Sequence, residues 1–377
     1  MRFLTINFYT SKEANLWKDN GGIPYALSRY YGYKSRYVYL DKHGIVKNEE
    51  YEKYVELDAI KSGNNTLINY FNILNYIYKN ANNFDVFNFY ELGIIGILAS
   101  KLAKIINPKI IVYNKLDMGR AIFIELTRNN SVKRKIKNFL LGKLTSCIDL
   151  YTVETYAYVE NLNKIERFKN RIKYLPNGFF SNLVELEKDI KKEKIILTVG
   201  RLGTLQKNTE MLVDAIENIE PEKLKNWKIY LVGSMTDEFT KWFNERLNAK
   251  PYLKNYFVAA GNISDKKELY TLYAKSSVFV LPSRWESWGL VLTEAMAFSC
   301  YPIVTDCCDA FFEMLDSANS NFGKIIPNED KSALKNAIEE VLDDKVDFKN
   351  NGIKAHEFVS ENFDWNIVVE NLDKYLK

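Results

Sequence analysis

The chain has 377 residues and is 47% hydrophobic, so it is long enough for two domains that each bury a core. No run approaches the roughly 18 apolar residues of a transmembrane helix, and residues 1–9 are too short and polar for a secretory signal. Four cysteines without ligand spacing indicate a reducing cytoplasm. With only two histidines, a histidine-based metal site and a Ser-His-Asp triad are disfavoured.

The net charge of +4 is distributed unevenly along the chain. Residues 1–185 carry an excess of ten positive charges, and residues 186–377 an excess of six negative charges. A basic first half is typical of a protein with an anionic partner, such as a phosphate-bearing acceptor or an acidic membrane face. Solvated lysines in a lysine-rich composition explain it equally well. We expect no nucleic-acid partner, because the basic residues form no recognised binding motif.

Apolar strand-like runs alternate with helix-period segments, which predicts an α/β fold with parallel sheets. In the first half we expect helices at 92–106 and 132–144 and strands at 2–9, 36–40, 85–89, 109–113, 150–153 and 172–175. In the second half we expect helices after residue 208 and at 265–274, and strands at 195–199, 228–232, 256–259, 278–281 and 302–305. The charged segment 185–194 lacks an apolar period and is predicted to link two doubly wound Rossmann-like domains, 1–184 and 195–360, that face a cleft.

The segment from Leu281 to Ala297 is the most informative part of the chain. A buried strand ends there, and Glu286 follows in a loop and Glu294 in a helix, an arrangement that builds a ligand crevice. Ionised carboxylates only accept hydrogen bonds, which suits a ligand rich in hydroxyls. The helix start near Ser287–Gly289 favours phosphate. Together these features suggest a nucleotide sugar, although two surface carboxylates on a capped helix remain the plain alternative.

Two further segments supply candidate phosphate contacts. The strand 195–199 ends at Gly200, and Arg201 and Lys207 follow within one loop, where two cations can hold a diphosphate. After the first strand, Gly21 and Gly22 open a helix and would let backbone come close to a ligand. Each segment alone is also typical of an ordinary solvated loop or turn.

Together these segments resemble the retaining GT-B glycosyltransferases, specifically glycosyltransferase family 4, also described as glycosyl transferases group 1. The resemblance covers most of the chain and is strongest from about residue 174 to residue 306. The matching pieces are Gly21-Gly22, Leu175-Pro-Asn-Gly178, Val199-Gly-Arg201 with Lys207-Asn208, and Glu286-x7-Glu294 followed by Ala-Met-Ala.

The resemblance implies a GT-B fold with an acceptor-side domain at 1–184, a nucleotide-sugar-binding domain at 195–360 and a helix at 361–377 that crosses back. It implies that Arg201 and Lys207 hold the donor diphosphate, that Glu286 orients the transferred sugar, and that Glu294 binds the ribose. The other implied donor-binding residues are Gly21, Gly22, Gly200, Asn262, Ile263, Ser287, Trp288, Gly289 and Leu290.

The chain departs from the family pattern in two places. Where the family often has a histidine after the fourth strand, Lys115 and Asp117 are the candidates for the sugar or acceptor contact. Trp288 stands where a smaller aromatic is commoner and would narrow the donor-sugar pocket. No Asp-x-Asp occurs, so we expect neither a metal nor a cofactor, and a UDP- or GDP-linked sugar as donor substrate.

The segment 128–143 carries an apolar stripe of Val132, Ile136, Phe139 and Leu140, with five basic residues between Lys133 and Lys143. Such a helix would lie on an acidic membrane, as suits an enzyme with lipid-linked acceptors. An amphipathic helix with its stripe in the core has the same pattern. We therefore expect a cytoplasmic protein, with contact to the inner face of the membrane left open.

The sequence predicts a retaining glycosyltransferase that moves a sugar from a nucleoside-diphosphate donor to a hydroxyl of a glycan or lipid-linked acceptor. Bacterial surface polysaccharide or glycolipid assembly is the pathway suggested by the family. A sugar epimerase would need further acid–base groups, and a phosphorylase would need a lysine that binds pyridoxal phosphate. A catalytically silent subunit that binds a glycan or a partner enzyme is the alternative from another class.

Overall fold

The computed structural model describes residues 1–377 except 11–12, 43, 45, 91, 129–131, 182–185, 187–189 and 316–321. The chain divides into two compact units: unit 1 comprises Met1–Gly178 and Trp365–Lys377, and unit 2 comprises Phe179–Asp364. The division lies at residue 178, ahead of the segment 185–194 that the sequence assigns to a linker. Within the described residues, no helix is long and apolar enough to cross a membrane.

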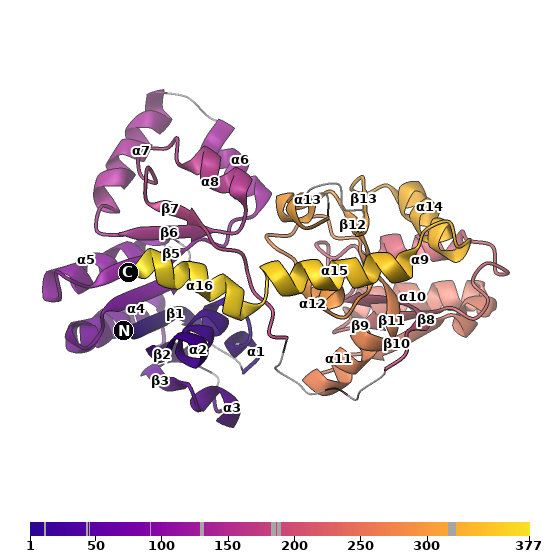
Figure 1. Ribbon diagram of the computed structural model, residues 1–377, viewed down its shortest axis with the longest axis horizontal. Coiled ribbons are helices and arrows are strands. Elements are labelled where there is room, and N and C mark those ends of the chain that lie inside the picture. Colours follow the sequence, from indigo (N-terminus) through magenta and orange to yellow (C-terminus); the bar gives the residue numbers. More distant parts are fainter. Residues whose placement is uncertain are drawn as a thin grey trace. The chain divides into compact units, whose positions relative to one another are not determined.

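Unit 1 contains a seven-stranded sheet in which every neighbouring pair is parallel, in the order β3-β2-β1-β4-β5-β6-β7 (Figure 1). Its strands are β1 (Arg2–Thr10), β2 (Lys34–Asp41), β3 (Val55–Lys61), β4 (Val86–Tyr90), β5 (Ile111–Lys115), β6 (Leu150–Val153) and β7 (Ile172–Tyr174). The chain builds outward from β1 in one direction and from β4 in the other. The switch point of unit 1 therefore lies between β1 and β4, where open α/β sheets bind ligands.

Except for the C-terminal helix, the helices of unit 1 lie between its strands along the chain, as alternating helix and strand periods predict. They are α1 (Glu13–Leu16), α2 (Asp19–Tyr31), α3 (Glu49–Glu52), α4 (Thr66–Asn80), the 3-10 turn η1 (Ala81–Asn83), α5 (Ile94–Ile106), α6 (Arg120–Arg128), α7 (Val132–Leu144), α8 (Tyr156–Leu162) and the C-terminal α16 (Trp365–Leu376). Helix α16, yellow in Figure 1, packs against α2, which is indigo.

Unit 2 contains a six-stranded parallel sheet in the order β10-β9-β8-β11-β12-β13. Its strands are β8 (Glu193–Val199), β9 (Lys228–Val232), β10 (Phe257–Gly261), β11 (Ser276–Leu281), β12 (Tyr301–Thr305) and β13 (Lys324–Ile326). The order reverses between β8 and β11, which places the switch point of unit 2 there. Glu193 and Lys194, which the sequence assigns to the linker, lie in β8.

Helices cover both faces of the unit 2 sheet. They are α9 (Thr209–Glu217), α10 (Asp237–Ala249), the 3-10 turn η2 (Pro251–Asn255), α11 (Lys266–Lys275), α12 (Leu290–Ala297), α13 (Asp309–Leu315), α14 (Lys331–Leu342) and α15 (Phe348–Asn362). Along β8, Ile195 and Leu197 belong to one buried core and Ile196 to the other. A strand buried on both faces reads as a continuous apolar run, which is why the sequence reveals it so clearly.

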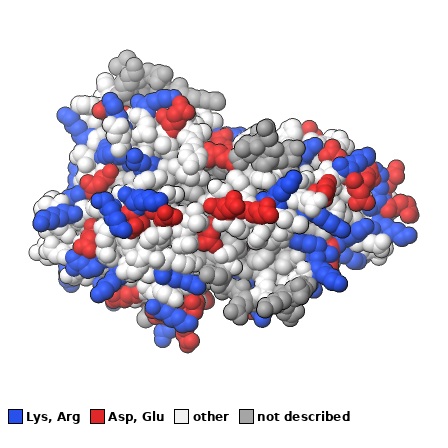
Figure 2. Space-filling model, in the orientation of Figure 1, with Lys and Arg blue, Asp and Glu red and all other residues white. Residues whose placement is uncertain are grey.

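Lys and Arg side chains are interspersed with Asp and Glu side chains over the face that Figure 2 shows. The blue and red groups alternate there over short distances. On this face, the basic excess of the first half of the sequence therefore does not form one continuous basic surface.

Candidate functional site

The site in unit 2 starts where β8 ends. Gly200 follows β8, and its backbone N–H donates to the Val232 carbonyl at 2.9 Å. A Cβ on Gly200 would lie 3.3 Å from Lys207 Cε, and a Cβ on Gly233 would lie 1.7 Å from the Gly200 carbonyl oxygen. Gly233 also has a φ of +132°, a region that residues with side chains rarely adopt. The two glycines thus allow the loops after β8 and β9 to approach closely beneath Lys207.

Lys207 and Glu286 lie in the loops that follow β8 and β11, the two strands that flank the switch point. The Lys207 Nζ lies 2.5 Å from Glu286 Oε1, and their side chains are 14% and 8% exposed. Ser283 Oγ donates to the same oxygen at 2.7 Å. The sequence-predicted lysine and glutamate therefore meet directly, and two donors fix the orientation of the carboxylate.

Gln206 connects this pair to Arg201. Arg201 is exposed and donates through Nη2 to Gln206 Oε1 at 2.6 Å. The Gln206 amide donates in turn to the Trp285 carbonyl at 3.0 Å and to Glu286 Oε2 at 3.4 Å. Hydrogen bonds thus connect the loop after β8 with the loop after β11, and Arg201 and Lys207 belong to one polar network.

Helix α12 begins directly after this loop. Gly289 occupies its N-cap position with φ of +82°, and Leu290 is its first residue. The first N–H groups of a helix have no partner within the helix, so this end can bind an anion. The Ser287 carbonyl accepts a hydrogen bond from Cys308 Sγ at 3.3 Å, which holds this residue in place.

The Trp288 side chain does not line a donor pocket as the sequence predicted. Its indole is 2% exposed, donates through Nε1 to Thr293 Oγ1 at 3.1 Å and packs edge-on against Phe363. The ring belongs to the core of unit 2 because it packs on Phe363 and its N–H has a partner, so that a large aromatic side chain is buried without loss of a hydrogen bond. Only the backbone of Trp288 remains a candidate for a donor contact.

Glu294 lies in α12 and is held by three donors from α11. Lys266 Nζ lies 3.1 Å and Tyr270 Oη 3.4 Å from its Oε1, and Tyr273 Oη lies 3.3 Å from its Oε2. Burial, together with the nearby carboxylate, raises the pKa of both tyrosine hydroxyls, so they remain donors. The glutamate is 16% exposed and is therefore a fixed acceptor that keeps access to solvent.

Asn262 and Ile263 follow β10 at the same edge of the sheet. Asn262 is exposed and Ile263 partly buried. Gly261, which precedes them, accepts from the Gly233 N–H at 2.7 Å. All of the donor-binding residues that the sequence assigns to unit 2 therefore follow the carboxyl ends of β8, β10 and β11.

In unit 1, Gly21 and Gly22 lie inside α2 and are buried. A Cβ on Gly21 would lie 2.4 Å from the Leu16 carbonyl oxygen, and one on Gly22 would lie 2.8 Å from the Trp365 ring. Close packing of α1 and α16 on α2 thus explains both glycines. Their contact with a donor, which the sequence suggests, stays a prediction.

Lys115 and Asp117 occupy different environments at the end of β5. Lys115 is fully buried, with its Nζ 2.9 Å from Glu154 Oε1 and 3.2 Å from the Leu175 carbonyl. Asp117 is exposed. Lys115 therefore does not present its ammonium group on the surface, and Glu154 is a buried partner that the sequence did not single out.

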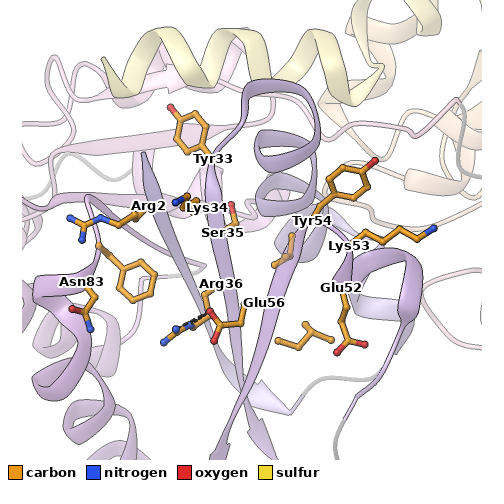
Figure 3. A pocket seen from close by; sticks show the side chains of 13 residues that line it. Arg2, Tyr33, Lys34, Ser35, Arg36, Glu52, Lys53, Tyr54, Glu56 and Asn83 are labelled. Carbon is orange, nitrogen blue, oxygen red and sulfur yellow. Dashed lines mark hydrogen bonds and ion pairs between the residues drawn. The ribbon is translucent and has the colours of Figure 1, made fainter.

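A pocket of about 680 Å³ lies at the opposite, amino edge of the unit 1 sheet (Figure 3). Arg2, Lys34 and Val55, which line it, are the first residues of β1, β2 and β3. Arg36 is paired with Glu56 at 2.8 Å across it. Because ligands of open α/β sheets bind beyond the carboxyl ends, we do not assign the functional site to this pocket.

Comparison with known proteins agrees with this geometry. Residues 185–358, which contain the whole site of unit 2, match the family described as "Glycosyl transferases group 1". The lipopolysaccharide core biosynthesis mannosyltransferase LpsB of Rhizobium meliloti (strain 1021) is 30% identical over 152 residues, which cover 39% of this chain and 42% of LpsB. These findings show that unit 2 is similar to group 1 glycosyltransferases. The chain spans less than two thirds of the length of the curated relatives that it matches.

Solved structures show the GT-B fold of this chain. Sucrose-phosphate synthase from Thermosynechococcus elongatus superposes with a TM-score of 0.72 at 17% identity, covering 100% of this chain and 98% of that one. Anabaena Alr3699/HepE in complex with UDP also reaches 0.72, at 14% identity, covering 100% and 99%. Two parallel-sheet Rossmann-like units, as the sequence predicts, are therefore confirmed.

Several residues of the unit 2 site are not evident from the sequence. Gln206 and Ser283 are polar neighbours of predicted residues, and their position beside a cation or a strand end was the only signal. Lys266 stands one residue after the helix cap Asp265, where a solvated lysine is ordinary. Its pairing with Glu294 depends on how α11 packs beside α12, which no local pattern encodes.

Proposed function

We propose that the protein is a retaining glycosyltransferase that moves a sugar from a nucleoside-diphosphate donor to an acceptor hydroxyl. The observation that carries the proposal is the Lys207–Glu286 contact at the switch point of unit 2, beside Arg201 and the N-terminus of α12. Such a site can bind a diphosphate and a hydroxyl-rich sugar together.

The main barrier to this reaction is departure of the charged diphosphate. Arg201, Lys207 and the free N–H groups of α12 would stabilise the negative charge that develops, at roughly 3 kcal/mol per donor by analogy with oxyanion holes. In this proposal the leaving phosphate accepts the proton of the acceptor hydroxyl. The cations supply the charge compensation, so we propose a reaction that needs no metal and no cofactor.

Glu286 would orient the transferred sugar through its hydroxyls, and Glu294 would accept from the ribose. The nucleobase would lie against the backbone near Asn262 and Ile263. A second HepE structure is a complex with UDP-glucose, and this supports a UDP-linked donor as the first to test here. GDP-linked sugars are the next class.

For the acceptor we propose a glycan or a lipid-linked saccharide of a bacterial surface polysaccharide or glycolipid. The role of LpsB in lipopolysaccharide core biosynthesis supports this class. We also propose a location on the cytoplasmic face of the membrane through residues 128–143. Residues 129–131 and the side chains of Arg128, Val132, Lys133, Arg134, Lys135, Lys137 and Asn138 lie outside the described part.

The described side chains of α7 support that contact. Ile136, Phe139 and Leu140 are each more than half exposed, and Lys143 Nζ lies 4.7 Å from the centroid of the Phe139 ring. An apolar stripe that faces solvent with a lysine beside it is typical of a helix that lies in the membrane interface. The core alternative would have required these three side chains to be buried.

A thermal-shift screen against UDP, GDP, dTDP, ADP and CMP, each with and without EDTA, tests the proposal. A ligand that binds only the native state raises the melting temperature. We expect a shift with one nucleoside diphosphate that EDTA leaves unchanged, and sugar release from the corresponding donor. No shift with any of them at millimolar ligand would contradict the proposal and favour a catalytically silent binding subunit.

A further inference from the structure

Helices α4 and α5 of unit 1 are apolar on their outer sides as well as on their inner sides. The two helices pack against each other (Figure 1). Their inner sides contribute Ile73, Ile77, Ile95, Ala99 and Ala103 to the core of unit 1. Their outer sides carry further large apolar side chains that are exposed to solvent. A helix that is apolar all round is normally buried all round, so we expect something outside unit 1 to cover these helices.

The exposed apolar area of these two helices is large. Seven of the twenty large apolar side chains that are exposed in the described part of the chain lie on them, with exposed fractions from 42% to 77%. They form what we call the α4–α5 surface: Leu67, Ile68, Phe71, Tyr78, Ile94, Leu98 and Ile105. With roughly 200 Å² for a fully exposed large side chain, this surface presents on the order of 900 Å². The largest apolar patch of a typical monomer is about 300–600 Å², so the area indicates a macromolecular partner.

The charges of α4 and α5 favour a protein partner over a membrane. The two helices contain no acidic residue, and their only basic residues are Lys79, Lys101 and Lys104. Of these, Lys104 is paired with Asp149 at 2.8 Å. A helix that lies in a membrane interface has a strongly charged face rich in Lys and Arg, which two remaining lysines do not provide. Depletion of charged residues is typical of the core of a protein–protein interface.

The exposed side chains form a matching row on each helix. Each row has exposed apolar residues at positions i, i+4 and i+11, namely Leu67, Phe71 and Tyr78 in α4 and Ile94, Leu98 and Ile105 in α5. These offsets return to one side of an α-helix, so each row is about 16 Å long. Position i+7 holds Leu74 in α4 and Lys101 in α5, and both are partly buried. Each helix starts within five residues of the end of a parallel strand, so both run in the same direction from the same edge of the sheet.

From this area, charge and spacing we infer that the α4–α5 surface is an interface with a second copy of this chain. A two-fold axis parallel to the helices places α4 of each copy on α5 of the other and keeps every residue at its height, so the two rows face each other in register. The facing pairs are Leu67 with Ile94, Phe71 with Leu98, and Tyr78 with Ile105, and each pair forms twice. A standard interface buries about 800 Å² per partner, which the α4–α5 surface supplies. This inference is independent of the proposed function.

Sedimentation velocity and light scattering of the full chain test the inference. At micromolar concentration we expect twice the mass of one chain, which is 44.0 kDa. Phe71→Glu and Leu98→Lys should each raise the dissociation constant of the dimer about 100-fold or more, because each leaves an unpaired charge in an apolar interface. Both side chains are exposed in the single chain, at 69% and 45%, so the circular dichroism spectrum should stay that of wild type. Ile353→Glu on α15, where the side chain is 50% exposed, is the matched control and should remain a dimer.

The double variant Phe71→Glu, Leu98→Lys tests the pairing of the rows. Opposite charges then face each other twice across the two-fold axis, so the double variant should recover about tenfold or more of the affinity that each single variant loses. The control is Phe71→Glu, Leu67→Lys, which places both charges on one helix and should recover none. A dimer that the single variants break and Phe71→Glu, Leu98→Lys does not restore would support the interface and overturn the pairing of α4 with α5.

Two results would overturn the interface itself. One is a wild type that remains at the mass of a single chain at about 100 μM; loss of binding to vesicles of anionic lipid in Phe71→Glu would then assign the α4–α5 surface to a membrane. The other is a dimer whose dissociation constant is unchanged in both Phe71→Glu and Leu98→Lys, because its interface would then lie elsewhere on the chain.

Discussion

The Lys266 ammonium group lies 3.1 Å from Glu294 Oε1, which joins the first residue of α11 to the middle of α12. Tyr270 and Tyr273, on the same helix, donate to the same carboxylate. A carboxylate has about four lone-pair positions, so these three donors leave capacity for at least one more. The carboxylate that we propose for the ribose is thus already oriented by the protein before any donor arrives.

Glu294→Gln should therefore weaken nucleotide binding without unfolding unit 2. The amide has the same shape but lacks the charge and replaces one acceptor oxygen with a donor group. Loss of charge-assisted bonds costs about 1.5–3 kcal/mol, so the Kd for UDP or the preferred nucleotide should rise about 10- to 100-fold by calorimetry. Glu268→Gln, on the exposed side of α11, is the control. Equal nucleotide affinities of Glu294→Gln and Glu268→Gln would show that Glu294 does not bind the donor.

Lys207→Met should abolish most turnover. The variant removes a cation from the proposed diphosphate site and also leaves Glu286 buried with Ser283 and Gln206 as its remaining donors. We expect kcat to fall about 100-fold or more and the free energy of unfolding to fall by about 1–3 kcal/mol. Steady-state kinetics and urea titration measure the two effects separately.

The double variant Lys207→Met, Glu286→Gln separates stability from chemistry. Because it removes the unpaired buried charge, it should regain part of the lost stability, yet it should recover no activity. Recovery of turnover along with stability would mean that Lys207 acts only in folding. Lys225→Met, an exposed lysine after α9, is the control for loss of a positive charge.

Most of the fold follows from the sequence, because strands buried on both faces leave continuous apolar runs. The runs at 150–153 and 228–232 coincide with β6 and β9. The apolar runs do not reveal β3 and β13, which are edge strands. In β3 only Val55 and Ile60 are buried, and β13 has three residues, so neither leaves a run long enough to recognise.

The unit 2 site was partly predictable for a topological reason. Residues that follow β8 and β11 must meet, because these strands are neighbours at the switch point. The direction of the Trp288 ring was not predictable, since it depends on Phe363, 75 positions away in the chain. The Lys115–Glu154 pair depends likewise on the pairing of β5 with β6, and Glu154 alone resembles any polar residue ahead of a helix.

Lys192→Met should destabilise unit 2. Its Nζ donates to the carbonyls of Tyr273, Ser276 and Phe298, which lie at the ends of α11 and α12. Removing these bonds leaves buried carbonyls short of donors, and we expect a loss of about 1–3 kcal/mol by urea titration. Lys191→Met, which is exposed, should change the free energy of unfolding by less than about 0.5 kcal/mol. A comparable loss in both variants would contradict the role of the buried ammonium group.

The contribution of Lys192 to the free energy of unfolding depends on pH, and the burial of its ammonium group sets the direction of this dependence. Burial lowers the pKa of Lys192, so between that pKa and 10.5 the unfolded state binds more protons than the native state. Native stability then increases with pH over this window. The stability difference between wild type and Lys192→Met should therefore grow as pH rises towards 10.5.

Replacing the exposed apolar residues of α7 should weaken membrane binding. The triple variant Ile136→Ser, Phe139→Ser, Leu140→Ser removes apolar groups that would be buried in the membrane interface. Each methylene group lost should weaken the free energy of membrane binding by about 0.8 kcal/mol. Sedimentation with vesicles containing anionic lipid should show the loss, as should charge reversal of Lys133, Arg134 and Lys135. The control is Ile353→Ser on α15, which removes an equally exposed apolar side chain. Unchanged vesicle binding in both α7 variants would dismiss the contact.

Glu154→Gln should change how stability depends on pH. Burial raises the pKa of Glu154 to about 7 from 4.5 in the unfolded chain, so between these values the native state binds more protons than the unfolded state. The stabilising effect of this proton is fully present below pH 4.5 and is lost as pH rises through about 7, by about 3 kcal/mol in all. Wild type should therefore lose stability relative to Glu154→Gln between pH 5 and pH 8, when unfolding by urea is measured at each pH. A constant difference between the two proteins would mean that Glu154 ionises in the native state as it does in water, and that Lys115 fully compensates its burial.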